Sequence, residues 1–133
     1  MPWLAHEALR EQSGSHPCDR RRPKSELAKL FPNVDFDQIE SELDPLYPKY
    51  GNSVREPDEA VAVRGSQFLQ WLASRSEREI IIVTHSAYLR QLLGKGKVID
   101  VEDSSPETFA NCEMRTYSIS LSAAPSYRAQ KTE

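Results

Sequence analysis

The clearest hydrophobic pattern lies between residues 56 and 94 and predicts a helix, a strand and a second helix. Apolar side chains recur at helical spacing from Glu56 to Ser74, and they form one face. The β-branched run Ile80–Thr84 has no polar alternation, which is typical of a strand covered on both faces in a parallel sheet. Ser86–Leu93 is an amphipathic helix pattern, and Gly94 supplies its end. The expected buried face of the first helix comprises Val61, Gly65, Phe68, Leu69 and Leu72.

Residues before this pattern predict mostly loop. Ser25 can cap a short helix through Phe31, which Pro32 ends. Residues 33–54 are acidic and interrupted by prolines, so we expect surface loop with one short helix near Phe36–Leu43. The chain opens on Trp3-Leu4 without the apolar strand and glycine-rich turn with which most α/β domains begin.

Residues after the second helix predict a loop, a strand and a tail. Residues 95–111 contain glycine and proline and read as loop. From Cys112 to Leu121, apolar and polar residues alternate, which indicates a half-exposed strand. Ala123–Glu133 lacks either periodicity and is expected to be a loose tail. We therefore predict one domain over residues 1–121, followed by a tail over 122–133.

Composition narrows the classes of function. The chain has 133 residues, of which 38% are hydrophobic, and this is enough to build a core without disulfides. Its formal net charge of -3 and pI of about 5.7 give no basic excess, so nucleic-acid binding is not expected.

Cysteine usage and the N-terminus indicate a cytoplasmic protein. Cys18 and Cys112 are far apart in sequence and have no metal-ligand spacing, which favours two reduced thiols over a disulfide or a zinc site. The first residues have no basic and apolar regions of a secretory signal. The run Ile80–Val83 is far too short to span a bilayer, so no membrane partner is expected.

His85 is the first candidate for chemistry, because it follows the predicted strand and precedes the predicted helix. Ligands of open α/β sheets bind beyond the carboxyl ends of strands, and free N–H groups at a helix start favour an anion such as phosphate. An imidazole there can stabilise phosphoryl oxygens and exchange protons near neutral pH. The alternative is a histidine that only ends a strand and caps a helix.

Two charged groups in the first loop are further candidates. Glu11 precedes Gly14 and could donate a proton if it were desolvated beside His85; alternatively, it is a solvated surface acid. The run Arg20-Arg21-Arg22 could bind an anionic substrate, since guanidinium groups bind phosphates and carboxylates bidentately. Its alternative is a solvated basic loop that pairs with the acidic stretch 35–44.

Taken in order, these motifs resemble the histidine phosphatase superfamily, and more closely its plant-type phosphoglycerate-mutase-like members. The resemblance runs from about Leu9 to Ile119. Each matching stretch is short, but their order and spacing make the joint match specific. The stretches are Leu9-Arg10-Glu11, Gly14 to Arg22, Phe31-Pro32 with Val34 to Phe36, Val54-Arg55-Glu56, Arg64 with Phe68-Leu69 and Trp71-Leu72, Val83 to Ser86 with Leu89, and Phe109 to Arg115.

The resemblance implies a three-layer α/β/α fold with a mostly parallel sheet, and phosphoryl transfer from phosphomonoesters through a phosphohistidine. It implies no metal and no other cofactor. His85 would be the second, phosphate-contacting histidine and Glu11 the proton donor, both catalytic. Ser86 would bind phosphate, and Arg21 and Arg22 would contact a phosphorylated small-molecule substrate.

One family motif is not found in these residues. The family's nucleophile lies in an Arg-His-Gly motif at the end of the first strand, and none of His6, His16 and His85 is preceded by Arg or followed by Gly. Without it the phosphohistidine route is closed, so we expect impaired or no activity. A sheet without that first strand would expose apolar faces and edges. These features suggest a truncated product, a gene model without its first exon, or a splice form.

Two other functions remain open from sequence. The chain could be a non-catalytic module that binds phosphorylated ligands or other proteins, including a homodimer that completes its sheet. It could also be a hydrolase that uses His85 as general base, although no Gly-x-Ser-x-Gly motif is present to support this. Mutase and phosphatase share the same site chemistry; the plant-type resemblance favours phosphatase.

Overall fold

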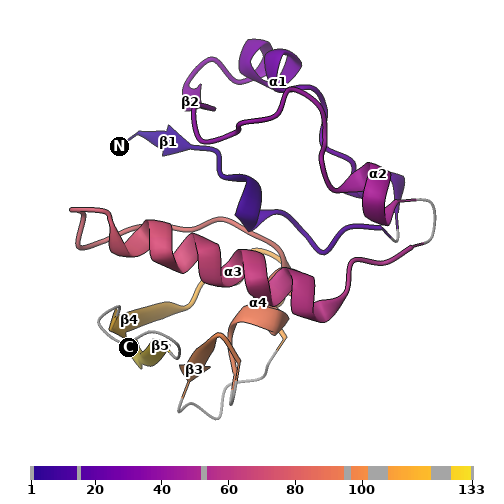
Figure 1. Cartoon of the computed structure of the whole chain (residues 1–133). Helices are drawn as coiled ribbons and strands as arrows, with labels where there is room; N and C mark the ends of the chain where they lie inside the picture. The colour runs from indigo at the N-terminus through magenta and orange to yellow at the C-terminus, as the bar shows by residue number, and fades with distance from the viewer. Residues whose placement is uncertain are drawn as a thin grey trace. The chain divides into compact units, whose positions relative to one another are not determined.

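A computed structural model describes residues 2–14, 16–51, 54–94, 97–101, 108–120 and 127–132. The chain divides into two compact units, Met1–Glu56 and Pro57–Glu133, and each is described by itself. Both contain helices and parallel strand pairs (Figure 1), which agrees with the predicted α/β class.

The first unit is built from short elements. Strand β1 (Trp3–Leu4) pairs in parallel with β2 (Val34–Asp35), and the Ala5 N–H extends this pairing to the Asp35 carbonyl at 2.8 Å. The helix predicted before Pro32 is found as α1, but the predicted cap is wrong. Ser25 lies inside the helix, its hydroxyl donates to Glu42 at 2.6 Å, and Pro23 occupies the N-cap position. The remaining elements are the 3-10 helices η1 (Glu7–Leu9) and η2 (Pro17–Asp19), then α1 (Lys24–Leu30) and α2 (Tyr47–Tyr50).

The helix predicted near Phe36–Leu43 is wrong, and polar side chains explain why. The Asp37 N–H binds the Asp35 side chain at 2.8 Å, which starts a turn instead of a helix. The Ile39 carbonyl accepts from Lys24 Nζ, and the carbonyls of residues 41–43 accept from the Arg21 side chain. Those carbonyls therefore have partners other than the N–H four residues on that a helix would require.

The second unit contains two helices and a three-stranded sheet. Helix α3 (Asp58–Ala73) and helix α4 (Ser86–Leu92) confirm both helix predictions. Strand β5 (Tyr127–Thr132) lies at the centre of the sheet, parallel to β3 (Ile99–Val101) and antiparallel to β4 (Thr116–Ser120). Strand β4 confirms the predicted alternating strand in shortened form. The rest of that prediction, at Leu121, lies outside the described residues.

The core of the second unit joins α3 to α4. Phe68, Leu69 and Tyr88 are almost completely buried, and the predicted face of α3 is buried as expected. Gly65 permits the close approach, because a Cβ at this position would lie 2.6 Å from a terminal carbon of Leu92. At the end of α4, Gly94 has a φ of 140° and its N–H binds the Ile99 carbonyl, which leads the chain into β3.

Four strands occur where the sequence pattern indicates none: the two-residue strands β1 and β2 of the first unit, and β3 and β5 of the second. Strand β3 lies in the predicted loop 95–111, much of which is outside the described residues, and three residues are too few for a visible alternation. Strand β5 lies in the predicted tail, and its polar sequence is paired on both sides. The described part of that tail is therefore a strand, whereas the domain boundary near residue 121 stays a prediction.

The strand predicted at Ile80–Thr84 is wrong in this structure. The segment has no regular structure, and its four apolar side chains are 38 to 72% exposed. None of the described strands pairs with it. A β-branched run prefers a strand only when neighbouring strands supply hydrogen bonds and packing, so pattern alone does not produce one here. No helix in the described part of the chain is long and apolar enough to cross a bilayer.

Replacement of Leu69 by alanine tests the α3–α4 core. Leu69 is 1% exposed, so Leu69→Ala should lower the free energy of unfolding by about 2–5 kcal/mol, as expected for a large-to-small core change. The matched control is Val63→Ala on the same helix, because Val63 is 58% exposed. It should change stability by less than about 0.5 kcal/mol in urea unfolding. Equal effects of the two changes would contradict this core.

Candidate functional site

His85 lies directly before α4, as the sequence pattern predicts. It has an extended backbone (φ -122°, ψ 156°), and its carbonyl accepts the Leu89 N–H at 3.0 Å to start the helix. The imidazole makes no capping hydrogen bond and is exposed. Its ring nitrogens are therefore accessible to a ligand. The helix that follows has only seven residues, so the dipole that it adds is small.

Ser86 lies next to a second matched stretch, the turn 108–115. Its Oγ is 3.5 Å from the Phe109 carbonyl, a long hydrogen bond that connects the start of α4 to this turn. The Arg115 guanidinium lies 3.9 Å from the centre of the Phe109 ring, and Arg115 Nε binds Glu113 at 2.6 Å. Glu113 also accepts the Ala110 N–H at 2.7 Å. The turn is thus held in shape by its own side chains, with the Phe109 carbonyl against Ser86.

Tyr88, in the first turn of α4, packs this helix into the core of the second unit. Its ring is fully buried, and the Arg64 guanidinium of α3 lies 5.1 Å from the ring centre. Burial raises the pKa of the Tyr88 hydroxyl to about 12, although the nearby Arg64 charge opposes the rise. Tyr88 is therefore an uncharged packing residue at neutral pH, and it fixes the helix turn that begins at His85.

Glu11 lies in a loop whose backbone is fixed by buried polar groups. The buried Gln12 side chain donates to the Glu56 carbonyl at 2.8 Å. The Ser13 N–H donates to the Glu56 carboxylate at 3.1 Å, and the Ser13 carbonyl accepts the Glu56 N–H at 2.8 Å. Gly14 has a φ of 114° and lies so close to the carbonyls of residues 50 and 54 that a Cβ would be 2.0 Å from each. This pairing places Glu11, itself half-buried, at the end of a rigid segment.

Glu11 and His85 are found in different compact units. Glu11 belongs to Met1–Glu56, and its carboxylate accepts the Gln12 N–H at 2.9 Å. His85 belongs to Pro57–Glu133. Each unit is described by itself, so the joint role of these two residues stays a prediction.

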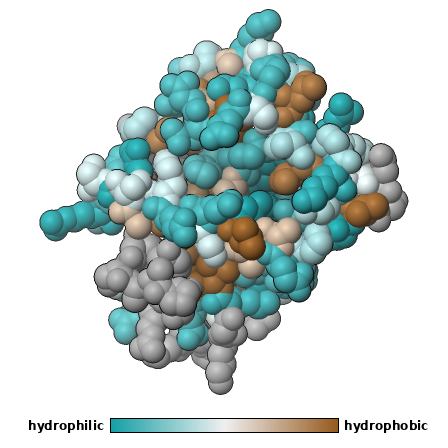
Figure 2. Space-filling model, viewed as in Figure 1, coloured by the Kyte–Doolittle hydropathy of each residue, from teal (hydrophilic) through white to brown (hydrophobic). Residues whose placement is uncertain are grey.

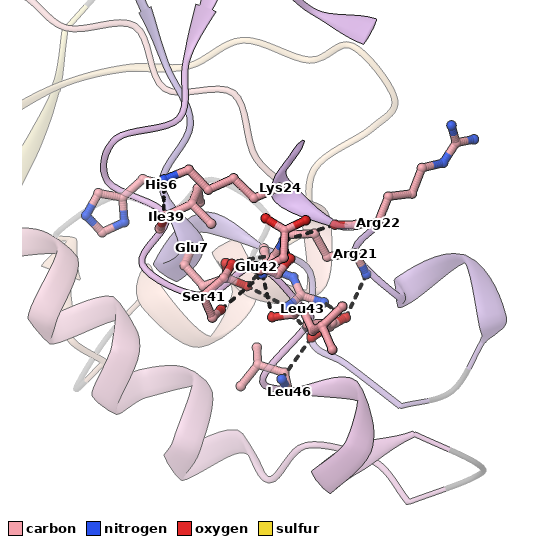
Figure 3. Close-up of polar contacts among 12 residues, drawn as sticks. His6, Glu7, Arg21, Arg22, Lys24, Ile39, Ser41, Glu42, Leu43 and Leu46 are labelled. Carbon is pink, nitrogen blue, oxygen red and sulfur yellow. Dashed lines mark hydrogen bonds and ion pairs between the residues drawn. The ribbon is translucent and has the colours of Figure 1, made fainter. Parts of the chain in front are cut away.

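Arg21 has a structural role in the first unit (Figure 3). Its five N–H groups all have acceptors in that unit: Nε binds Glu7, and the two terminal nitrogens bind carbonyl groups and a hydroxyl. The acceptors of the terminal nitrogens are Arg22 O, Glu42 O, Ser41 O, Ser41 Oγ and Leu43 O. A substrate anion would have to displace these groups, which is unfavourable for an arginine that is only 8% exposed.

Arg22 is different from its neighbour. Its side chain is 62% exposed and makes one ion pair, to Glu26 of α1 at 3.2 Å. A surface pair of this kind contributes about 0–1 kcal/mol, so it can be exchanged for an anionic ligand. Of the two arginines predicted to contact substrate, Arg22 is the accessible one.

Asp44 and Arg10 form an ion pair that the sequence analysis missed. The pair is bidentate, with both nitrogen–oxygen distances at 2.7 Å, and Arg10 also binds Glu7 at 2.6 Å. The Asp44 carboxylate further accepts the N–H groups of Arg21, Leu46 and Tyr47. Burial alone would raise its pKa, but the Arg10 guanidinium and these amides outweigh burial and lower the pKa of Asp44 to about 2. The resemblance includes Arg10, but no local signal connects it to Asp44.

The other two histidines, His6 and His16, each lie directly before a short 3-10 helix of the first unit. His6 precedes η1, and its Nδ1 accepts the Ala8 N–H at 3.2 Å. Burial lowers the pKa of His6, partly opposed by Glu7, so its neutral form is favoured. His16 is exposed and precedes η2. Among the described residues, no group of three His, Cys, Asp or Glu is placed to hold a metal ion.

The chain belongs to the histidine phosphatase superfamily (branch 1), whose family model matches residues 1–124. It is 44% identical over 118 residues to a phosphoglycerate mutase-like protein of Arabidopsis thaliana, a match that covers 86% of this chain and 42% of the relative. It is 46% identical over 118 residues to phosphoglycerate mutase-like protein 1 of the same plant, covering 86% and 41%. The chain thus spans about two-fifths of the length of these relatives. No solved structure shows a significant match to this chain.

The Asp44 ion pair should make stability depend on pH in acid. A lowered pKa in the folded state means that the stabilisation is complete above the ordinary value of 3.8 and is lost as the pH falls toward 2. Between pH 5 and pH 3, the loss from this group should be about 1 kcal/mol. Urea unfolding of Asp44→Asn should accordingly show a stability deficit that narrows by this amount over the same range.

Asp37→Asn is the control for this experiment, because Asp37 is an exposed aspartate of the same unit. Between pH 5 and pH 3, the unfolding free energy of Asp37→Asn should differ from that of the unsubstituted chain by a constant amount. A deficit of Asp44→Asn that is constant from pH 5 to pH 3 would show that the carboxylate charge does not stabilise this fold.

Proposed function

We propose that these residues bind the phosphoryl group of a phosphomonoester through His85 and Ser86, with Glu11 as proton donor and Arg22 as a substrate contact. The observation that carries this proposal is the accessible imidazole of His85 in a stretch that matches the histidine phosphatase superfamily. The His85 imidazole and the Ser86 hydroxyl would donate hydrogen bonds to phosphoryl oxygens. Arg21 would support the loop from within the first unit without touching substrate.

The phosphohistidine route needs a nucleophile in addition to these groups. In that route a histidine nitrogen forms a bond to phosphorus, and the bond from phosphorus to the ester oxygen breaks. The leaving oxygen takes a proton from Glu11, and water then releases phosphate from the histidine. The 133 residues contain no Arg-His-Gly motif, so we propose that the nucleophile must come from outside them. No metal or other cofactor takes part in this proposal.

A non-catalytic phosphate-binding role is the second candidate. The lack of an Arg-His-Gly motif in these residues favours it, because binding needs only the second histidine and its neighbours whereas turnover needs the nucleophile.

We propose the cytoplasm as the location for either function. Cys18 and Cys112 are both free thiols on the surface, which fits a reducing compartment.

Phosphate binding should stabilise the chain and depend on His85. Inorganic phosphate at ten times its dissociation constant should add about 1.4 kcal/mol to the unfolding free energy. His85→Asn should abolish this stabilisation by phosphate. The variant should keep α4 intact, because asparagine is a favoured residue before a helix. His16→Asn is the matched control, since His16 is also exposed and precedes a short helix. Equal stabilisation of all three proteins by phosphate would exclude His85 as a ligand.

Turnover should be absent from the 133-residue chain by itself. With p-nitrophenyl phosphate we expect no hydrolysis above background. Co-expression with the part of an Arabidopsis relative that this chain does not match should produce hydrolysis, and His85→Asn in the chain should remove it. Hydrolysis by the isolated chain that disappears in His85→Asn would disprove the need for an external nucleophile.

A further inference from the structure

Two arginines precede Ser25 at positions that basophilic protein kinases recognise. Such kinases bind guanidinium groups upstream of the accepting serine through their own acidic side chains. Among all serines and threonines of the chain, only Ser13, Ser25 and Ser118 have an arginine three positions earlier. Ser25 alone also has one five positions earlier, and its two arginines are Arg20 and Arg22.

The fold distinguishes these three serines. Ser13 is 0% exposed, and the backbone around Ser118 is paired with a neighbouring strand inside β4. Ser25, in the first turn of α1, is exposed. Figure 2 shows mainly hydrophilic side chains on the face in view, and α1 lies at the top of that view (Figure 1). Because a kinase must reach both the hydroxyl and the chain before it, the fold favours Ser25.

The segment before Ser25 displays its two recognition arginines together. Arg20 and Pro23 have ψ angles of 123° and 140°, which are values of extended chain. Successive side chains of an extended chain point in opposite directions. Accordingly, Arg21 is only 8% exposed and has acceptors within its own unit, whereas Arg20 is exposed and the Arg22 side chain is 62% exposed. Figure 3 shows Arg22 pointing away from the cluster around Arg21.

We propose that Ser25 is a phosphorylation site for a basophilic serine/threonine kinase, and that its phosphate repels Glu42 and binds Arg22. In the transfer, Ser25 Oγ forms a bond to the γ-phosphorus of ATP, ADP leaves with the bridging oxygen, and the hydroxyl proton passes to the kinase. In the unmodified chain this hydroxyl donates to the Glu42 carboxylate at 2.6 Å, and the Ser25 N–H lies 3.3 Å from both carboxylate oxygens. A phosphate with a charge of about -1.5 to -2 beside that carboxylate repels it.

Arg22 is well placed to receive the phosphate. It pairs at 3.2 Å with Glu26, the residue next to Ser25, and the two side chains of this pair are 62% and 49% exposed. Such a pair contributes little and can be exchanged, whereas a phosphate offers a guanidinium three strong acceptor oxygens. The Glu42 side chain can move without releasing its backbone, because the Glu42 carbonyl still accepts the Lys24 N–H at 2.9 Å.

Phosphorylation at this position would oppose the substrate contact proposed for Arg22, because a guanidinium that binds the phosphate is less available to a substrate anion. This consequence rests on the proposed function. The modification site and the exchange of partners do not rest on it, since they concern only residues 20–26 and Glu42. A failure of phosphate binding at His85 would therefore leave both of them unchanged.

Incubation of the full chain with ATP and the catalytic subunit of cyclic-AMP-dependent protein kinase tests the site. We expect one phosphate per chain, located on Ser25 by mass spectrometry of peptides, and none in Ser25→Ala. Arg22→Gln should slow the transfer at least about tenfold, as expected for the loss of a charge-assisted contact. The matched control is Arg78→Gln, which removes another exposed arginine and should leave the rate unchanged.

Failure to modify Ser25, or an equal rate in Arg22→Gln, would overturn the site. Ser13 serves as an internal control for folding, because it also follows an arginine by three positions but is buried. Phosphate on Ser13 would show that the kinase acts on unfolded chain and would overturn the selection of Ser25 by the fold.

A thermodynamic cycle tests the exchange of partners. Longer incubation brings Ser25 to complete phosphorylation in the unsubstituted chain, in Arg22→Gln and in Glu42→Gln, and urea unfolding then gives the change in stability on phosphorylation. This change should be more unfavourable in Arg22→Gln, which lacks the new partner, and less unfavourable in Glu42→Gln, which lacks the repelling charge. An identical change in all three proteins would overturn the exchange of partners.

Discussion

A β-branched segment that no described strand pairs with is the constraint on which the second unit depends. Residues 80–83 lie between α3 and the helix that starts after His85, and they have the composition of a buried strand. Their backbone hydrogen-bonding groups and apolar side chains need a partner that none of the described strands provides. Full burial of an Ile or Val side chain stabilises a protein by about 1.5–3 kcal/mol, and covering these partly exposed side chains would gain a part of that for each. The same stretch of chain leads directly into His85, so whatever covers it also determines how firmly that imidazole is held.

The first unit depends on buried charges more than on apolar packing. Its helices and strands are short, and the Asp44 carboxylate connects Arg10 to the backbone at the start of α2. Arg21 performs the complementary task by binding carbonyls of the segment 41–43. Removal of one partner from such a buried network leaves the other charge uncompensated, which is more costly than the net contribution of the pair. The guanidinium of Arg21, whose residue type suits a substrate contact, is thus used for contacts within this unit.

Sequence predicts the elements that local periodicity specifies. Helix α3 needs only its own pattern of Val61, Phe68 and Leu69 to define a buried face, and α4 follows from an amphipathic run that Gly94 ends. The predictions for β5 and for the segment 80–84 are wrong for one reason: strand formation depends on partners distant in the sequence. The assignment of Arg21 to substrate follows from residue type, which shows what a guanidinium can bind, whereas only the fold shows that its five N–H groups already have acceptors.

The same distinction separates the two halves of the candidate site. His85 can be located from sequence because a strand-like run, a histidine and a helix are consecutive, and the structure leaves its imidazole accessible. The loop that carries Glu11 is held by residues far along the chain, through Glu56 and through the close contact of Gly14 with the carbonyls of residues 50 and 54. A proton donor must keep its geometry while charge develops on the leaving oxygen, so a rigid loop fixed by distant buried groups suits that role. In the proposed chemistry, His85 would therefore be positioned by local sequence and Glu11 by the fold.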